Sequence, residues 1–283
     1  MDGLIIVNKE KNYTSRDVVN IISKELGTKQ IGHTGTLDPI ATGVLVVGYG
    51  KATKIFEFLF QDDKEYIAKV KLGILTDTLD ITGNIIREDN NFTITEDQIV
   101  KALSAFKKKY IQEVPMFSAV KVNGKKLYEY ARNGEQVDIP KKEVEIKDIE
   151  LISFDKNTFS FRCVVSKGTY IRSLIRDIGE YLGIPCVMEE LERTRQGLFR
   201  IEDSCTLDDV KTGNYKIISL KEALSSYKQV ELTEELRFKV INGQKLDLPY
   251  KDKILVFTEN GKVVGIYKKD GNIYKAHKIV NQQ

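Results

Sequence analysis

The chain has 283 residues, of which 41% are hydrophobic and 30% are charged, and its formal net charge is +3. This composition is typical of a globular protein and excludes an intrinsically disordered chain. No run approaches the roughly 18 consecutive apolar residues of a membrane-spanning helix, and the first residues lack the apolar segment of a signal peptide. We therefore expect a cytoplasmic protein without a membrane partner.

The cysteines and histidines restrict the chemistry further. Cys163, Cys186 and Cys205 are odd in number and widely spaced, so they predict neither a disulfide framework nor a metal-binding pair. His33 and His277 are the two histidines of the chain, too few for a multi-histidine metal site. The net charge is too small to establish a nucleic-acid partner. We expect no metal and no cofactor.

The first part of the chain predicts a mixture of strands and helices. Residues 4–7 are an apolar run typical of a strand, and the spacing of Thr14 and Asp17 resembles a capping box that would begin a helix. Residues 65–72 alternate apolar and polar side chains, which is the period of a half-buried strand. A second helix is predicted over residues 95–106.

The middle of the chain continues the same mixture. Residues 144–154 and 158–166 are rich in β-forming side chains, and residues 170–182 have the apolar spacing of an amphipathic helix that Gly183 and Pro185 would end. Because strands and helices mix without strict alternation, we expect an α+β fold.

The last part of the chain has a different pattern. Short apolar runs are separated by Glu-Asn-Gly at 259–261 and Lys-Asp-Gly at 269–271, which are strong signals for hairpin turns. We predict that residues 229–283 form a small all-β module, joined to the rest through a polar stretch at 211–228.

The segment with the most unusual composition is GHTGTLDPIATG, residues 32–43. Its glycines permit positive φ or close approach of a ligand, and Pro39 fixes the chain direction directly after the carboxylate of Asp38. From composition alone, a glycine-rich loop with one carboxylate is compatible with an ordinary turn as well as with an active site.

This segment, extended to GHTGTLDPIATGVL, resembles the signature of the TruB family of tRNA pseudouridine synthases. Further segments resemble the same family in the same order: GKATK (50–54), KEY (64–66), LGILTDTLD (72–80), VPMFSAVK (114–121) running into GKKLYEYAR (124–132), and SKGTYIR (166–172). The sequence departs from the family pattern at Glu10, Phe117 and Glu192, where we expect proline, tyrosine and a basic residue.

The resemblance implies both a fold and an activity. The fold is a pseudouridine synthase-like catalytic domain with a mixed or antiparallel sheet at residues 1–228, containing an RNA-gripping insert at 115–145. Residues 229–283 would be a PUA-like RNA-binding domain. The activity is isomerisation of uridine to pseudouridine at position 55, in the T loop of tRNA, after the base is flipped out of its stack. The sequence indicates no obligate protein partner.

The resemblance also implies roles for individual residues. Asp38 would be the nucleophile, Arg172 would pair with it and keep it ionised, and Tyr66 would lie against the target uracil. His33 would lie near the flipped nucleotides. Basic and aromatic residues of the insert and of the segments after it are the remaining candidates for RNA contact: Lys121, Lys125, Lys126, Tyr128, Arg132, Lys167 and Arg176.

Two other functions remain compatible with these residues. An RNA-binding or RNA-folding protein without catalysis could use the same basic and aromatic surface. A hydrolytic N-glycosylase also attacks a bond between base and sugar, commonly with paired carboxylates. The motif has no second carboxylate next to Asp38, which disfavours the hydrolase.

Overall fold

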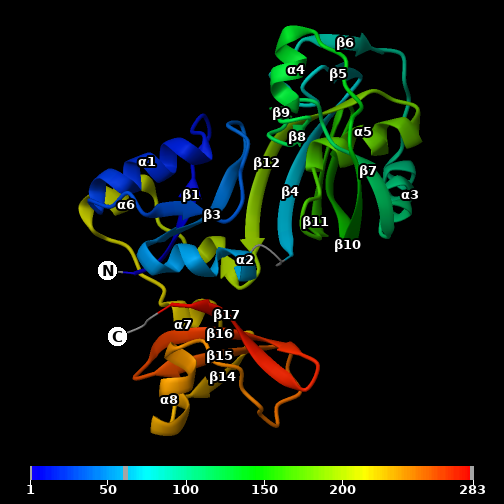
Figure 1. Ribbon diagram of the computed structural model, residues 1–283. Helices are drawn as coiled ribbons and strands as arrows, with labels where there is room; N and C mark the ends of the chain where they lie inside the picture. The colour runs from blue at the N-terminus through cyan, green and yellow to red at the C-terminus, as the bar shows by residue number, and fades with distance from the viewer. Residues whose placement is uncertain (1, 60–62, 281–283) are drawn as a thin grey trace. The chain divides into compact units, whose positions relative to one another are not determined.

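The computed structural model describes residues 2–59 and 63–280. The chain forms two compact units, coloured by residue number in Figure 1. Unit 1 comprises Met1–Pro39, Val44–Gln61 and Leu198–Gln283, and unit 2 comprises Ile40–Gly43 and Asp62–Gly197. Within the described ranges, no helix is both long enough and apolar enough to cross a membrane.

The N-terminal part of unit 1 is a small layer of strand and helix. β1 (Gly3–Lys9) lies next to β3 (Thr42–Tyr49), and β2 (Ile31–His33) pairs antiparallel with β3. α1 (Ser15–Glu25) begins with the predicted capping box, because the side chain of Thr14 accepts a hydrogen bond from the backbone of Asp17. The shorter elements of unit 1 are a 3-10 helix at Gly50–Ile55, α2 (Phe56–Leu59), β13 (Phe199–Arg200), a 3-10 helix at Ile201–Asp203, α6 (Leu207–Thr212) and α7 (Leu220–Ala223).

The C-terminal part of unit 1 is a four-stranded sheet with the order β14-β15-β16-β17. Its strands are β14 (Lys228–Glu231), β15 (Ile254–Glu259), β16 (Lys262–Asp270) and β17 (Ile273–Ile279). Both predicted hairpin turns are confirmed, since they join β15 to β16 and β16 to β17. The module also contains α8 (Glu234–Ile241), which was not predicted because its apolar residues are not gathered on one face.

One hydrophobic cluster of unit 1 joins distant parts of the chain. Leu4 and Val46 from the first strands share it with Val256 and Ile266 from the C-terminal sheet. The stretch at 211–228, predicted to be a polar connection, also contributes Leu220, Ala223 and Leu224 to this cluster.

Unit 2 is built on the strand order β12-β4-β11-β10-β7, in which each neighbouring pair is antiparallel. The start of β3 adds a parallel pairing of Thr42 and Gly43 with Glu192 and Arg193, so the sheet is mixed as expected. The sheet strands are β4 (Lys64–Leu72), β7 (Lys109–Glu113), β10 (Lys141–Asp155), β11 (Thr158–Val165) and β12 (Cys186–Gln196). The other elements are β5 (Ile74–Thr76), β6 (Ile85–Glu88), α3 (Glu96–Ala105), β8 (Lys121–Val122), β9 (Lys125–Lys126), α4 (Leu127–Asn133) and α5 (Ile171–Leu182).

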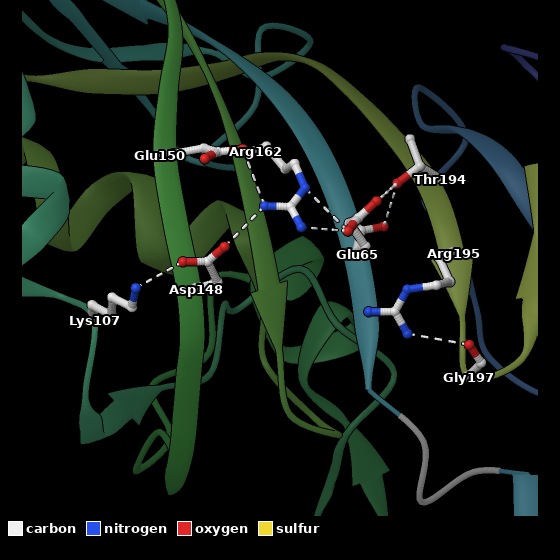
Figure 2. Close-up of polar contacts among 8 residues, drawn as sticks. All are labelled: Glu65, Lys107, Asp148, Glu150, Arg162, Thr194, Arg195 and Gly197. Carbon is white, nitrogen blue, oxygen red and sulfur yellow. Dashed lines mark hydrogen bonds and ion pairs between the residues drawn. The ribbon is translucent and has the colours of Figure 1, made fainter. Parts of the chain in front are cut away.

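The two faces of this sheet differ in polarity. α5 contacts β12 and β4, and α3 contacts β10 and α5, so these helices cover the apolar face. On the other face, Figure 2 shows the guanidinium of Arg162 between Glu65 and Asp148, at 2.8 and 2.9 Å. Thr194 donates to Glu65 at 2.9 Å, so this polar network joins four adjacent strands beside the end of β4 that carries Tyr66.

Candidate active site

Asp38 lies in the loop between β2 and β3 and is half-buried. The residue before it is anchored by Ser15, the first residue of α1. The hydroxyl of Ser15 accepts from the backbone N–H of Leu37 at 2.8 Å and donates to the carbonyl of Leu37 at 3.1 Å. Ser15 is 2% exposed, so water does not compete with these two bonds.

The residue after Asp38 is anchored by Lys9. The ammonium group of this fully buried lysine donates to the carbonyl oxygens of Pro39 (3.3 Å), Glu10 (2.9 Å) and Tyr13 (2.7 Å). A buried ammonium group needs such acceptors, because desolvation of an unpaired charge is costly. The main chain is thus fixed on both sides of the Asp38 carboxylate.

The ends of the same loop have their own restraints. His33 Nδ1 accepts from the backbone N–H of Gly35 at 3.3 Å, so this contact uses the neutral imidazole with its proton on Nε2. Gly43 has φ +98, and a Cβ there would lie 2.3 Å from the carbonyl oxygen of Arg193. The predicted positive φ is confirmed at Gly43, where the close approach is to the main chain of β12.

Tyr66 lies in unit 2, on the buried face of β4, and is 7% exposed. It is paired in register with Cys163 of β11 and Arg193 of β12. The predicted alternation is confirmed, since Ala68 and Val70 share its face. Tyr66 is therefore carried by a strand that has a hydrogen-bonded neighbour on each side.

Arg172 is the second residue of α5 and is 5% exposed. Its Nη1 donates to the carbonyl of Thr78 at 2.9 Å, and its Nη2 donates to the carbonyl of Phe117 at 3.0 Å. The planar fork of donors thus joins two loops, a geometry that lysine cannot reproduce.

Asp80 is a buried carboxylate two residues after Thr78, and it was not selected from the sequence. Its Oδ1 accepts from the hydroxyl of Thr78 (2.9 Å) and from the backbone and hydroxyl of Thr82 (3.0 and 2.5 Å). Leu79 between them has φ +63, an unusual conformation for a bulky residue. Asp80 therefore fixes the loop in which the carbonyl of Thr78 accepts a hydrogen bond from Arg172. The Thr-Asp-Thr-Leu-Asp motif at residues 76–80 was the sequence signal for Asp80.

The predicted RNA-gripping insert contains a hairpin followed by a helix. β8 and β9 are joined by Asn123 and Gly124, both with positive φ, and α4 follows directly. The ring of Tyr128 lies 5.3 Å from Lys126 Nζ and 5.4 Å from the guanidinium carbon of Arg132. The Nζ atom of Lys125 lies 4.6 Å from the centre of the Tyr130 ring and forms an ion pair with Glu135 at 2.6 Å. Contact of these residues with RNA stays a prediction.

The other predicted RNA-binding residues differ in environment. Lys121 and Lys167 are exposed. The guanidinium of Arg176 is paired with carboxylates of Asp177 at 2.7 Å and Glu113 at 3.5 Å. Its charge is therefore already matched by acidic groups.

The three predicted catalytic residues are divided between the units. Asp38 belongs to unit 1, whereas Tyr66 and Arg172 belong to unit 2, and their action on one substrate stays a prediction. In the part of the chain that the structure describes, no three His, Cys, Asp or Glu side chains are grouped so as to hold a metal ion.

Comparison with known proteins gives consistent matches. Residues 23–171 match the N-terminal domain of the TruB family pseudouridylate synthases, and residues 172–230 match the tRNA pseudouridylate synthase B C-terminal domain. The chain is 41% identical to tRNA pseudouridine synthase B of Clostridium tetani, over 99% of this chain and 100% of that one. It is 40% identical to the protein of that name from Bacillus pumilus, over 100% and 98%.

Solved structures give the same picture of the fold. A chain in the structure of an H/ACA RNP bound to a substrate RNA containing 2'-deoxyuridine matches at TM-score 0.74 and 25% identity, over 99% of this chain and 85% of that one. A chain of a Cbf5-Nop10-Gar1 complex matches at TM-score 0.75, with the same identity and coverage.

Proposed function

The chain belongs to the TruB family of pseudouridylate synthases, and we propose that it isomerises a uridine of tRNA to pseudouridine with Asp38 as the nucleophile. The full-length relatives are named for this reaction on tRNA. The position modified is uridine 55 of the T loop, and the reaction takes place in the cytoplasm.

The reaction requires little beyond the chain itself. The bond from uracil N1 to ribose C1′ breaks, the base rotates, and C1′ is joined to C5. The proton on C5 is lost and N1 gains one, so atoms and electrons balance without a redox partner. Asp38 attacks either C1′, so that the ribose is bonded to the carboxylate while the free uracil rotates in the site, or the uracil ring, so that the base is bonded to the carboxylate while it rotates. In both routes the bond to Asp38 breaks once C1′ has joined C5.

The observation that carries this proposal is the anchoring of the loop around Asp38. Leu37 is held by Ser15 and Pro39 by Lys9, both through buried polar atoms. A carboxylate nucleophile gains most from such a fixed backbone, because orientation of the reacting groups supplies much of the rate enhancement. An ordinary surface turn would not need two buried polar anchors.

The other residues act around this nucleophile. Arg172 aims the carboxylate of Asp38, and Tyr66 lies against the uracil and assists removal of the C5 proton. The flipped base costs a few kcal/mol of unstacking, which His33 and the surrounding loop help to offset.

RNA contact is assigned to two regions. The insert at 115–145 binds the T arm through Lys121, Lys125, Lys126, Tyr128 and Arg132. Lys167 and Arg176, which follow the insert in the sequence, also contact the RNA. Residues 1–228 are the catalytic domain, and residues 229–283 are the RNA-binding module. No obligate protein partner is required.

The test uses unmodified tRNA with tritium at uridine C5. Wild type should release tritium to water, whereas Asp38→Asn should bind the tRNA with unchanged affinity and release none. Release by the Asp38→Asn protein would refute the assignment of the nucleophile. Binding without release by either protein would favour the non-catalytic RNA-binding function, and free uracil among the products would favour a hydrolase.

A further inference from the structure

The start of α5 is capped in an unusual way. α1, α3, α6 and α7 each begin with a reciprocal capping box made by their own residues. The N-cap of α5 is Tyr170, whose side chain makes no cap hydrogen bond among the described residues. Because the first N–H groups of a helix have no partner inside it, those of α5 need acceptors from another element.

Gln112 of β7 supplies one of these acceptors. This side chain is 1% exposed. Its Oε1 accepts from the backbone N–H of Tyr170 at 2.8 Å, and its Nε2 donates to the carbonyl of Tyr170 at 3.2 Å. Since the backbone N–H can only donate, it determines which end of the side-chain amide is the oxygen. One glutamine thus holds both main-chain polar groups of the residue that begins the helix.

The orientation of this amide is fixed from its other side. Nε2 of Gln112 also donates to the hydroxyl of Tyr110 at 2.7 Å, and that hydroxyl donates to Asp177 of α5 at 3.1 Å. Burial, together with the neighbouring Asp177 carboxylate, raises the pKa of Tyr110, so the hydroxyl stays protonated and remains a donor. The chain of hydrogen bonds begins and ends on α5.

The next residue of β7 makes a second attachment. The hydroxyl of Ser173 donates to the carbonyl of Glu113 at 2.8 Å. β7 therefore holds Tyr170, the N-cap of α5, and Ser173 in its first turn, and Arg172 lies between them in the sequence. A small rotation of this turn would displace the Arg172 guanidinium from the carbonyls of Thr78 and Phe117.

We propose that Gln112 is a positioning residue for catalysis, which fixes the first turn of α5 and thereby sets the location of the Arg172 guanidinium. This inference rests on the proposed function, because Arg172 is assigned there to the reacting carboxylate. A displacement of about 1 Å in a catalytic group can reduce a rate about 100-fold. Loss of the Gln112 amide should therefore reduce kcat by roughly 10- to 100-fold while KM for tRNA changes less than about 2-fold.

The experiment compares Gln112→Met with Gln98→Met in the full chain. Gln98, an exposed residue, is the control for loss of a helix-capping amide, because its Oε1 accepts from the backbone N–H of Thr95 at 2.9 Å at the start of α3, which carries no proposed catalytic residue. Tritium release gives kcat and KM, and thermal unfolding reports the fold. The expected result is a lower kcat in Gln112→Met alone. If the Gln112→Met protein keeps the kcat of the wild type, the inference is overturned and the proposed function is unaffected. If the wild-type protein itself releases no tritium, both the proposed function and the inference are overturned.

A double-mutant cycle separates positioning from general destabilisation. If Gln112 acts through Arg172, then Gln112→Met should reduce kcat little further in an Arg172→Lys background. Losses that multiply in the double mutant would overturn the inference. If Gln112→Met does not fold, Ser173→Ala tests the second attachment, and it should lower kcat several-fold at unchanged KM. Unchanged kcat in Ser173→Ala would then overturn the inference.

Discussion

The ammonium group of Lys9 lies 3.3 Å from the carbonyl oxygen of Pro39, the residue that directly follows Asp38. The two residues are 30 positions apart in the sequence, and the lysine is fully buried. A buried charge thus holds the loop of the proposed nucleophile through the main chain.

Lys9→Met should lower the free energy of unfolding by about 2–4 kcal/mol, because carbonyl oxygens that the ammonium group satisfies would lose a buried donor. Urea unfolding measures the change. Lys11→Met is the control, since Lys11 is exposed and its loss should cost less than about 0.5 kcal/mol. Equal stabilities of the two variants would contradict the anchoring role of Lys9.

Gly43→Ala should cost roughly 3 kcal/mol or more, because the added Cβ meets positive φ and also the carbonyl of Arg193 at 2.3 Å. Gly27→Ala isolates the first effect, since Gly27 has φ +60 and nothing within 4 Å of the added Cβ. The control should lose about 1–2 kcal/mol. A Gly43 variant as stable as the Gly27 variant would show that the contact with β12 is readily relieved.

Tyr66→Phe and Tyr66→Ala separate two roles of the ring. Stacking on a base is worth about 1–3 kcal/mol, so the alanine variant should bind tRNA about 5- to 150-fold more weakly, whereas phenylalanine should bind as wild type does. If the hydroxyl assists removal of the C5 proton, Tyr66→Phe should still lose tritium release. Full activity in Tyr66→Phe would leave stacking as the role of this residue.

Glu65 should make the stability of the chain depend on acid pH. Burial raises the pKa of Glu65, but hydrogen bonds from Thr194 and Arg162 outweigh it and hold the pKa below its usual value. A group with a lowered folded-state pKa stabilises the protein above its unfolded pKa of about 4.3, and this contribution is lost as pH falls through the folded-state pKa. The stability difference between wild type and Glu65→Gln should therefore shrink from about pH 6 to about pH 3. A difference that stays constant over this range would contradict the assignment.

Binding of tRNA should weaken with added salt, and the log-log slope should be about −0.7 to −0.9 for each phosphate contacted. Arg132→Ala should make the slope less steep by roughly one such unit. Lys156→Ala is the control, because Lys156 is an exposed cation outside the predicted RNA-binding residues. If both variants change the slope equally, net charge rather than the insert governs binding.

Local patterns were enough to predict the elements that carry the site. The alternation of residues 65–72 predicted β4 and the buried face of Tyr66, and the spacing of Thr14 and Asp17 predicted the start of α1. These signals work because each arises within a few residues of the chain.

The anchors of the site could not be predicted in this way. Ser15 and Gln112 bind main-chain atoms 22 and 58 positions away, and such partners leave no trace in local periodicity. Leu220 and Leu224 are buried in a stretch whose composition is polar, and α8 has no apolar stripe. Tertiary contacts decided each of these features.

The discontinuity of unit 1 has a consequence for the order of folding during synthesis. Residues 62–197 leave the ribosome as one continuous stretch, so the main sheet of unit 2 can close early. Leu4 and Val46 must wait for Val256 and Ile266 before their hydrophobic cluster is complete. The face of β1 that carries Leu4 and Ile6 therefore lacks its C-terminal partners for most of the time of translation.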